Sequence, residues 1–181
     1  MREIQVSAIT ETVARLCVSA NRHLPADVQE AITRARAVEK WAPAQEILDR
    51  IRENYQIAGN HEVAICQDTG MACVFLEIGQ DVHLVGDLKE AVNEGVRQGY
   101  AQYLRKSVVR DPLDRVNTGD NTPAMLYTDL VPGDQVKITV APKGFGSENM
   151  SQIKMLKPSD GLQGVKDFIL KVVEGAGPNP C

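Results

Sequence analysis

The spacing of the apolar residues changes near residue 60, and this change constrains the fold more than any other feature of the chain. In the first third, apolar residues recur at the three- and four-residue spacing of amphipathic helices. Pro25, Pro43 and Gly59 interrupt the pattern. Proline is tolerated in a first helical turn and glycine favours a helix end. The spacing therefore predicts helices over residues 4–21, 27–40 and 43–57.

Beyond residue 60 the apolar runs are short and separated by turn-forming residues, which favours strands. The strands are predicted near residues 62–66, 71–79, 124–130 and 135–141. The last two are expected to form a hairpin around Val131-Pro132-Gly133-Asp134. Further helices are predicted over 87–109 and 161–174. The expected fold class is α/β (α+β), with N-terminal helices, a small mixed sheet and flanking helices in a single domain, 1–181.

Length, charge and hydropathy narrow the functional classes. A chain of 181 residues is the usual size of one domain. A net charge of −4 without a long basic run argues against nucleic acid and anionic membranes as partners. The apolar stretches are too short to span a bilayer, and the first ten residues have no signal-peptide core. Four cysteines in a chain of this size favour a reducing, cytoplasmic location.

The turn Cys66-Gln67-Asp68-Thr69-Gly70 is the first candidate for chemistry. A thiolate at a strand end can bind a soft metal or act as a nucleophile. The amide and the carboxylate that follow can orient a polar substrate, and Gly70 permits a left-handed turn. A buried cysteine before an ordinary turn is the alternative, since cysteine is commonly buried.

The remaining cysteines divide into two kinds. Cys181 follows a stiff segment of proline and glycine, which can pre-position a sulfur for iron–sulfur ligation; a tail cysteine without a role is the alternative. Cys17 lies on an apolar helical face and Cys73 inside a strand, so core packing is expected for both. The histidines are scattered in the sequence and are expected at the surface: His23, His61 and His83.

A glycine-rich segment and a basic cluster complete the candidates. Backbone N–H groups of Lys143–Asn149 could approach an anion closely, although a plain loop has the same composition. The segment lacks the GK[ST] of a phosphate-binding loop. Arg105, Lys106 and Arg110 lie near the end of a predicted helix, where basic residues also complement the helix dipole.

Five stretches, taken together, resemble the class I, iron–sulfur fumarate hydratase family, which also includes the α-subunits of tartrate dehydratases. They occur in the order of the family and at similar separations, over nearly the whole chain. They are Ile65–Gly70, Leu104–Ser107, Val116–Ala124, Lys143–Asn149 and Pro180–Cys181. Each stretch is weak alone, but five in order form a specific signature.

The resemblance implies the N-terminal α-part of a hydro-lyase that interconverts fumarate and L-malate, or a related hydroxy-dicarboxylate such as tartrate. The family holds a [4Fe–4S] cluster through three cysteines and leaves one iron open to the substrate. Cys66 and Cys181 match the first two ligands. The third ligand lies downstream in the family and has no counterpart among these residues, so a C-terminally truncated chain is expected.

The resemblance also assigns substrate contacts and partners. Gln67, Asp68, Arg105 and Gly146 match substrate-binding positions, and Asp68 is the expected catalytic residue of this chain. Phe145 replaces a glycine that relatives often carry. The catalytic base belongs to a β-subunit or β-region, so the chain alone is expected to be inactive, and a homodimer of αβ units is expected. The other hypotheses are a non-catalytic binding or assembly module and a thiol redox sensor.

Overall fold

The computed structural model describes residues 1–101, 104–111, 113–145 and 150–177. It divides the chain into two compact units, Met1–Lys143 and Gly144–Cys181. The helices of the first unit are α1 (Val6–Arg22), α2 (Ala26–Val38), α3 (Ala42–His61) and α4 (Leu88–Gly99). Its strands are β1 (Arg2–Gln5), β2 (Met71–Gly79), β3 (Val82–Val85), β4 (Met125–Val131) and β5 (Val136–Lys143).

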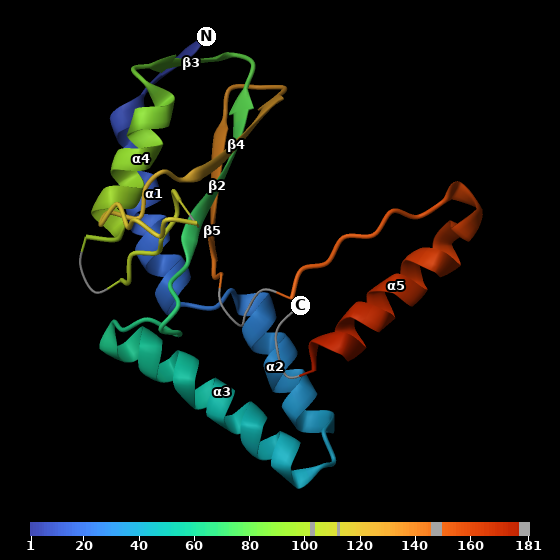
Figure 1. Cartoon of the computed structure of the whole chain (residues 1–181). Coiled ribbons are helices and arrows are strands. Elements are labelled where there is room, and N and C mark those ends of the chain that lie inside the picture. Colours follow the sequence, from blue (N-terminus) through green and yellow to red (C-terminus); the bar gives the residue numbers. More distant parts are fainter. Residues whose placement is uncertain (102–103, 112, 146–149, 178–181) are drawn as a thin grey trace. The chain divides into compact units, whose positions relative to one another are not determined.

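The core of the first unit lies between a three-stranded sheet and two helices. The sheet has the order β4-β2-β5, and α1 and α4 lie side by side on one of its faces (Figure 1). Alternate side chains of a strand point to opposite faces, so every second side chain of β2 points into the core. The buried apolar residues that α1, α4 and β2 contribute are Ile9, Val13, Cys17, Ala72, Val74, Leu76, Ile78, Val92 and Val96.

The expected hairpin of β4 and β5 is wrong, because β2 lies between them. β4 pairs with β2 in parallel and β5 pairs with it antiparallel. The connection crosses the end of β2, where the backbone N–H of Gly79 donates to the carbonyl of Gln135 at 2.8 Å. A Cβ at Gly79 would lie 2.3 Å from the carbonyl oxygen of Gly133, so the crossing requires glycine there. The apolar run of β2 makes it the central strand.

Two other expectations are corrected. The strand predicted near residues 62–66 is absent: α3 continues to His61, and the segment before β2 is irregular. The helix predicted over 87–109 ends at Gly99, ten residues early, because Tyr100 and Leu104 turn into the core instead of continuing the helical face. The sequence also did not predict β1 and β3, which form a separate parallel pair.

The mixed α/β class is confirmed, as are most of the helices and strands. β2 covers the predicted range 71–79, and α1, α2 and α3 lie within a few residues of their predicted ranges. In the described parts of the chain, none of the helices combines the length and apolar character that crossing a membrane requires.

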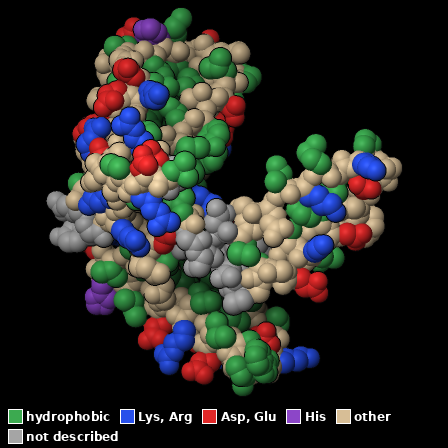
Figure 2. All heavy atoms as spheres, in the orientation of Figure 1, with side chains coloured by type: hydrophobic (Ala, Val, Ile, Leu, Met, Phe, Trp, Pro, Cys, Tyr) green, Lys and Arg blue, Asp and Glu red, His purple; other side chains and the backbone are tan. Residues whose placement is uncertain are grey.

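The second unit contains a 3-10 turn, η1 (Pro158–Asp160), and the helix α5 (Gly161–Ala176), close to the predicted range 161–174. The carboxylate of Asp160 accepts a hydrogen bond from the backbone of Lys157 at 2.8 Å, and Lys154 lies over the ring of Phe168. Apolar side chains stand at the surface of this unit (Figure 2). They include Ile153, Met155, Leu162, Ile169 and Leu170.

Candidate functional site

Cys66 lies in the irregular segment that links α3 to β2, and two neighbouring helices hold this segment. The backbone N–H of Ile65 donates to the carbonyl of Asn21, at the end of α1, at 2.9 Å. The side-chain amide of Asn54, on α3, donates to the carbonyl of Ile65 at 3.0 Å. The half-buried Cys66 thiol lies 3.4 Å from Oε1 of the exposed Gln67. The cysteine is therefore positioned by tertiary contacts and not by a strand.

Asp68 and Gly70 form a tight turn against the end of β5. Oδ1 of the half-buried Asp68 accepts a hydrogen bond from the backbone N–H of Gly70 at 3.1 Å, as aspartate does in turns. Gly70 has a φ of 65°, and a Cβ there would lie 2.5 Å from the carbonyl carbon of Lys143. Both the left-handed backbone and the close approach require glycine. The predicted left-handed turn is therefore present at Gly70.

Two hydrogen bonds join this turn to the segment that carries Arg105. Oγ1 of Thr69 donates to the carbonyl of Arg105 at 2.7 Å, across 36 positions of sequence. The hydroxyl of the buried Tyr100 donates to the carbonyl of Thr69 at 2.8 Å. The Arg105 side chain itself is exposed. The structure therefore brings the backbone around Asp68 and Arg105 together, and their roles toward a substrate stay predictions.

Sequence reasoning missed Asn121 as a residue of this region. Its side chain is fully buried, its amide Nδ2 donates to the carbonyl of Gly70 at 3.1 Å, and its Oδ1 accepts from the backbone N–H of Ser107 at 2.8 Å. Asn121 lies within the Val116–Ala124 stretch of the resemblance. The sequence indicated Asn121 only as a polar residue inside that stretch. Asparagine in a polar loop is more often exposed than buried, so this position did not stand out.

Asp120 anchors the same loop to α4. Burial alone would raise the pKa of this carboxyl, but hydrogen bonds from the hydroxyl and backbone of Thr122, from Thr118 and from Arg97 outweigh it and lower the pKa to about 2. The Arg97 guanidinium also pairs with Glu94 on its own helix. Asp120 is therefore a structural carboxylate, ionised at neutral pH.

The predicted cluster ligands Cys66 and Cys181 stay predictions. Cys181 and Gly146 lie outside the described residues. Within the described ranges, no three His, Cys, Asp or Glu side chains gather in a way that could hold a metal ion. Cys66 could serve as one ligand of a cluster, because its half-buried sulfur lies in a turn close to the surface, and a cysteine sulfur is a soft donor once deprotonated.

The other two described cysteines do not share this setting. Cys17 is fully buried, and burial raises the pKa of its thiol to about 12, which confirms its expected core position. Cys73 is only half-buried, on the face of β2 opposite the core, so its expected core packing is not found. The histidines are exposed, as predicted: His23, His61 and His83.

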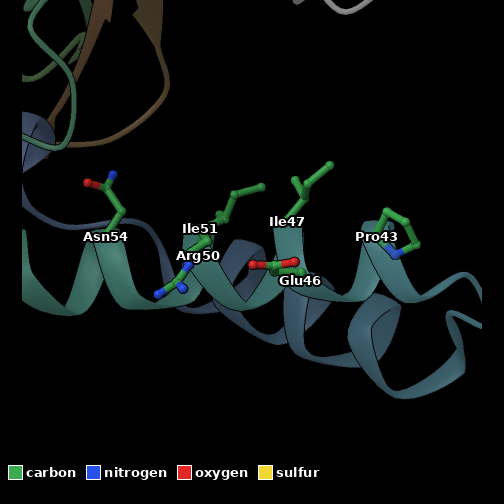
Figure 3. A pocket seen from close by; sticks show the side chains of 6 residues that line it. All are labelled: Pro43, Glu46, Ile47, Arg50, Ile51 and Asn54. Carbon is green, nitrogen blue, oxygen red and sulfur yellow. The ribbon is translucent and has the colours of Figure 1, made fainter.

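A shallow surface groove follows α3 and contains none of the predicted site residues. Figure 3 shows the side chains of Ile47, Ile51 and Asn54 on one side of this helix. The residues that line the groove are Pro43, Glu46, Ile47, Arg50, Ile51 and Asn54. Because they come from one helix and converge on no common point, the groove does not define a second reactive centre.

Comparison with known proteins identifies the class. The model of the family described as "Fumarate hydratase (Fumerase)" matches residues 10–181, and this chain belongs to that family. Cys66, Asp68 and Arg105 all fall within the matched range.

Two relatives of this chain have names that are more specific than the description of the family. The chain is 39% identical over 181 residues to the "Putative L(+)-tartrate dehydratase subunit alpha" of Methanocaldococcus jannaschii, covering 96% of this chain and 63% of that protein. It is 28% identical over 180 residues to the L(+)-tartrate dehydratase subunit alpha of Escherichia coli strain UTI89, covering 97% of this chain and 59% of that protein. The chain therefore spans about three fifths of the length of these relatives.

Proposed function

We propose that this chain is the α-part of a hydro-lyase that adds water to fumarate, or removes it from L-malate, tartrate or a related hydroxy-dicarboxylate. It acts together with the rest of the α-region and with a β-subunit or β-region, in a homodimer of αβ units. Residues 1–181 belong to one α-type domain of that enzyme. A cytoplasmic location is part of the proposal, because a reducing compartment keeps cluster-forming cysteines as thiols.

One observation carries the proposal: the hydrogen bond from Thr69 Oγ1 to the carbonyl of Arg105, 2.7 Å long. It brings the turn with a thiol and a carboxylate beside a segment with a guanidinium group. A hydroxy-dicarboxylate offers a carboxylate at each end and a hydroxyl between them, so it needs those groups close together. Membership of the family and the names of the relatives as α subunits support the same reaction class.

The proposed roles follow from the chemistry of each side chain. The Arg105 guanidinium binds one substrate carboxylate through two parallel N–H donors. The Gln67 amide orients the polar substrate, and the backbone N–H of Gly146 contributes a further donor. In hydration, the hydroxyl oxygen bonds to one alkene carbon and a proton bonds to its neighbour. Asp68 holds the hydroxyl through a hydrogen bond. A group of the β-region that starts protonated donates the proton to carbon and recovers one from the water that supplies the hydroxyl; in the dehydration direction the same group is the base.

Cys66 and Cys181 are proposed as two of three thiolate ligands of a [4Fe–4S] cluster. When bound, the cluster supplies a Lewis acid that polarises substrate oxygens without any net redox change. A thiolate is the preferred donor for iron in such clusters, whereas a serine hydroxyl is a harder and poorer ligand.

The proposal is tested with the complete enzyme, produced anaerobically with the remaining α-region and the β-region. We expect bound iron and sulfide, and loss of the ultraviolet absorbance of the fumarate double bond as water adds. L-malate and tartrate are assayed in the reverse direction in parallel, which separates the candidate substrates. An assembled enzyme that carries its cluster but converts none of these substrates contradicts the proposed reaction.

Three variants separate cluster binding from turnover. Cys66→Ser should abolish stable cluster binding, whereas the matched control Cys73→Ser should keep iron content and activity. Asp68→Asn should keep the cluster but lower kcat, because it retains the shape and removes the charge. Arg105→Lys should raise KM, since an ammonium cannot reproduce the paired guanidinium contact.

The matched control for Arg105→Lys is Arg34→Lys, which changes an exposed residue paired with Glu30 on α2 and should leave KM unchanged. Full cluster content together with full turnover in Cys66→Ser would overturn the assignment of this cysteine.

A further inference from the structure

We infer that Asn121 is a positioning residue of the proposed reaction, which holds the Asp68 turn and the Arg105 segment at a fixed separation. This inference rests on the proposed function and adds a residue that touches neither substrate nor cluster in that proposal. Its basis is the geometry of a single buried carboxamide that bonds to both segments.

The carboxamide of Asn121 bridges two stretches that are distant in sequence. Its Nδ2 donates to the carbonyl of Gly70, two residues after Asp68, at 3.1 Å. Its Oδ1 accepts from the backbone N–H of Ser107, two residues after Arg105, at 2.8 Å. A carboxamide carries a donor and an acceptor on one planar group, so it can make both bonds at once.

Burial makes both bonds costly to lose. The Asn121 side chain is 0% exposed. If the carboxamide is removed, the Gly70 carbonyl loses a partner in a buried position and the Ser107 N–H loses one in a partly buried position, so we expect one or both backbone segments to move. Catalytic geometry is sensitive to such movement, because a displacement of about 1 Å can lower a rate about a hundredfold.

Neighbouring contacts hold Asn121 itself. Asp120 is bonded to Thr122 Oγ1 at 2.7 Å and to Arg97 on α4 at 3.2 Å. The backbone of Asn121 has a φ of 65°, a left-handed conformation that asparagine adopts more readily than most residues. The loop therefore presents the carboxamide from a fixed backbone, and the bridge is one rigid unit rather than an adaptable surface contact.

The turn also has a second, independent support. Tyr100 binds the carbonyl of Thr69 at 2.8 Å, and the amide of Asn21 lies 3.4 Å from the Tyr100 hydroxyl. These bonds come from α1 and from the residue that follows α4, and they do not involve Asn121. We therefore expect loss of the Asn121 carboxamide to misalign the two segments without unfolding the turn.

The main test uses Asn121→Gly in the complete, cluster-loaded enzyme. Glycine retains the left-handed backbone and deletes the carboxamide together with its Cβ, so backbone strain is excluded as a cause. We expect kcat/KM to fall about a hundredfold with unchanged iron content. The matched control is Asn93→Ala, which removes another asparagine acceptor, bonded to the backbone N–H of Ala124 at 3.0 Å, and should change kcat/KM less than about threefold.

Coupling distinguishes positioning from a general loss of stability. If Asn121 acts through the placement of Asp68, then Asn121→Gly in an Asp68→Asn background should cost less than about threefold further, because most of the contribution of Asp68 is already gone. A merely structural residue would give multiplicative losses in the double variant. Multiplicative losses both in this background and in an Arg105→Lys background, or an Asn121→Gly enzyme no slower than the Asn93→Ala control, would overturn the inference.

A second variant keeps the test decisive if Asn121→Gly folds poorly. In Asn121→Asp, one carboxylate oxygen still accepts from Ser107, but the other faces the Gly70 carbonyl without a donor. Protonation restores that donor, so activity relative to the wild type should rise as the pH is lowered. A constant ratio of the two activities across pH would contradict the bridge.

Amide hydrogen exchange separates failure of this inference from failure of the proposed function. The Ser107 N–H loses its acceptor in Asn121→Gly and should exchange at least about tenfold faster, with no change in Asn93→Ala. If exchange is unchanged, the bridge is wrong whatever the activity. If exchange accelerates but the cluster-loaded wild type converts no hydroxy-dicarboxylate, the bridge stands as structure and the proposed function, with the positioning role built on it, is wrong.

Discussion

The helix pair α1/α4 and the helix pair α2/α3 arise from similar sequence patterns but differ in what they bury. α1 and α4 place Ile9, Val13 and Val96 in the core against the sheet. Of the residues that the structure describes, α2 has none that is buried and α3 has only Ala58. Apolar periodicity therefore predicts a helix correctly in both cases, but it does not say whether the apolar face meets a partner.

The difference has a physical origin in the sheet. β2 presents an unbroken apolar face, and α1 and α4 cover it at short range because Gly95 lets the helices approach closely. α2 and α3 are joined by the Arg36–Asp49 ion pair at 2.9 Å, and Ala58 is the only buried residue described on either helix. Burial contributes roughly 25 cal/mol per Å² of apolar surface, so the first pair stabilises the unit far more than the second.

The largest expected difference compares the same substitution in the two pairs. Ile9 is 2% exposed on α1 and Ile47 is 58% exposed on α3. Ile9→Ala should lower the free energy of unfolding by about 3 kcal/mol, because it leaves a cavity in the core. Ile47→Ala should change it by less than about 0.5 kcal/mol. Urea unfolding followed by circular dichroism measures both, and equal losses would show that α3 is covered in solution.

The effect of a glycine-to-alanine substitution on the free energy of unfolding should have opposite signs in the two helix pairs. A Cβ at Gly95 would lie 2.7 Å from the carbonyl oxygen of Thr10 and 2.8 Å from Val13 Cβ, so Gly95→Ala should destabilise by about 2 kcal/mol. At Gly59 on α3, the nearest atoms belong to the exposed His23 ring at 3.2 Å, which can move aside. Gly59→Ala should therefore stabilise by about 0.5 kcal/mol through helix propensity. Melting temperatures that fall in both variants would contradict this contrast.

The smallest expected effect is the pH-dependent contribution of one carboxylate to stability, compared between the two helix pairs. The pKa of Asp120 lies at about 2, below its ordinary value of 3.8, so the folded protein binds fewer protons there than the unfolded chain. The resulting stability, roughly 1 kcal/mol after a discount for solvent screening of the partly exposed Asp120 and Arg97, is present above about pH 4 and is lost as the pH falls through about 2.

Asp120→Asn should therefore melt lower than the wild type at pH 7, and the gap should close on acidification. The matched variant Asp49→Asn removes the carboxylate of the half-exposed α2/α3 ion pair and should shift melting by less than 1 °C at pH 7. A gap for Asp120→Asn that persists at pH 2 would show that its charge is not the cause.

The sequence predicted the residue types of the candidate site, but it did not predict the hydrogen bonds that hold these residues together. The Cys66–Gly70 turn stands out by composition, and the family resemblance directs attention to Arg105. The bonds that join them, from Thr69 to Arg105 and from Asn121 to Gly70 and Ser107, link positions 14 to 51 residues apart. Sequence spacing carries no information about such contacts, because hydrogen bonds between side chains and distant backbone depend on the final packing.

The sequence by itself determined those helices and strands whose pattern of apolar residues is sufficient to predict them. α1, α3 and β2 follow directly from the spacing of their apolar residues, since each helix or strand period is a property of the local backbone. Only the tertiary structure decided that β2 separates β4 from β5, and that α4 stops at Gly99. In both cases a local preference, for a hairpin or a longer helix, yields to the burial of the apolar face of β2 and of Tyr100, because burial is the larger free-energy term.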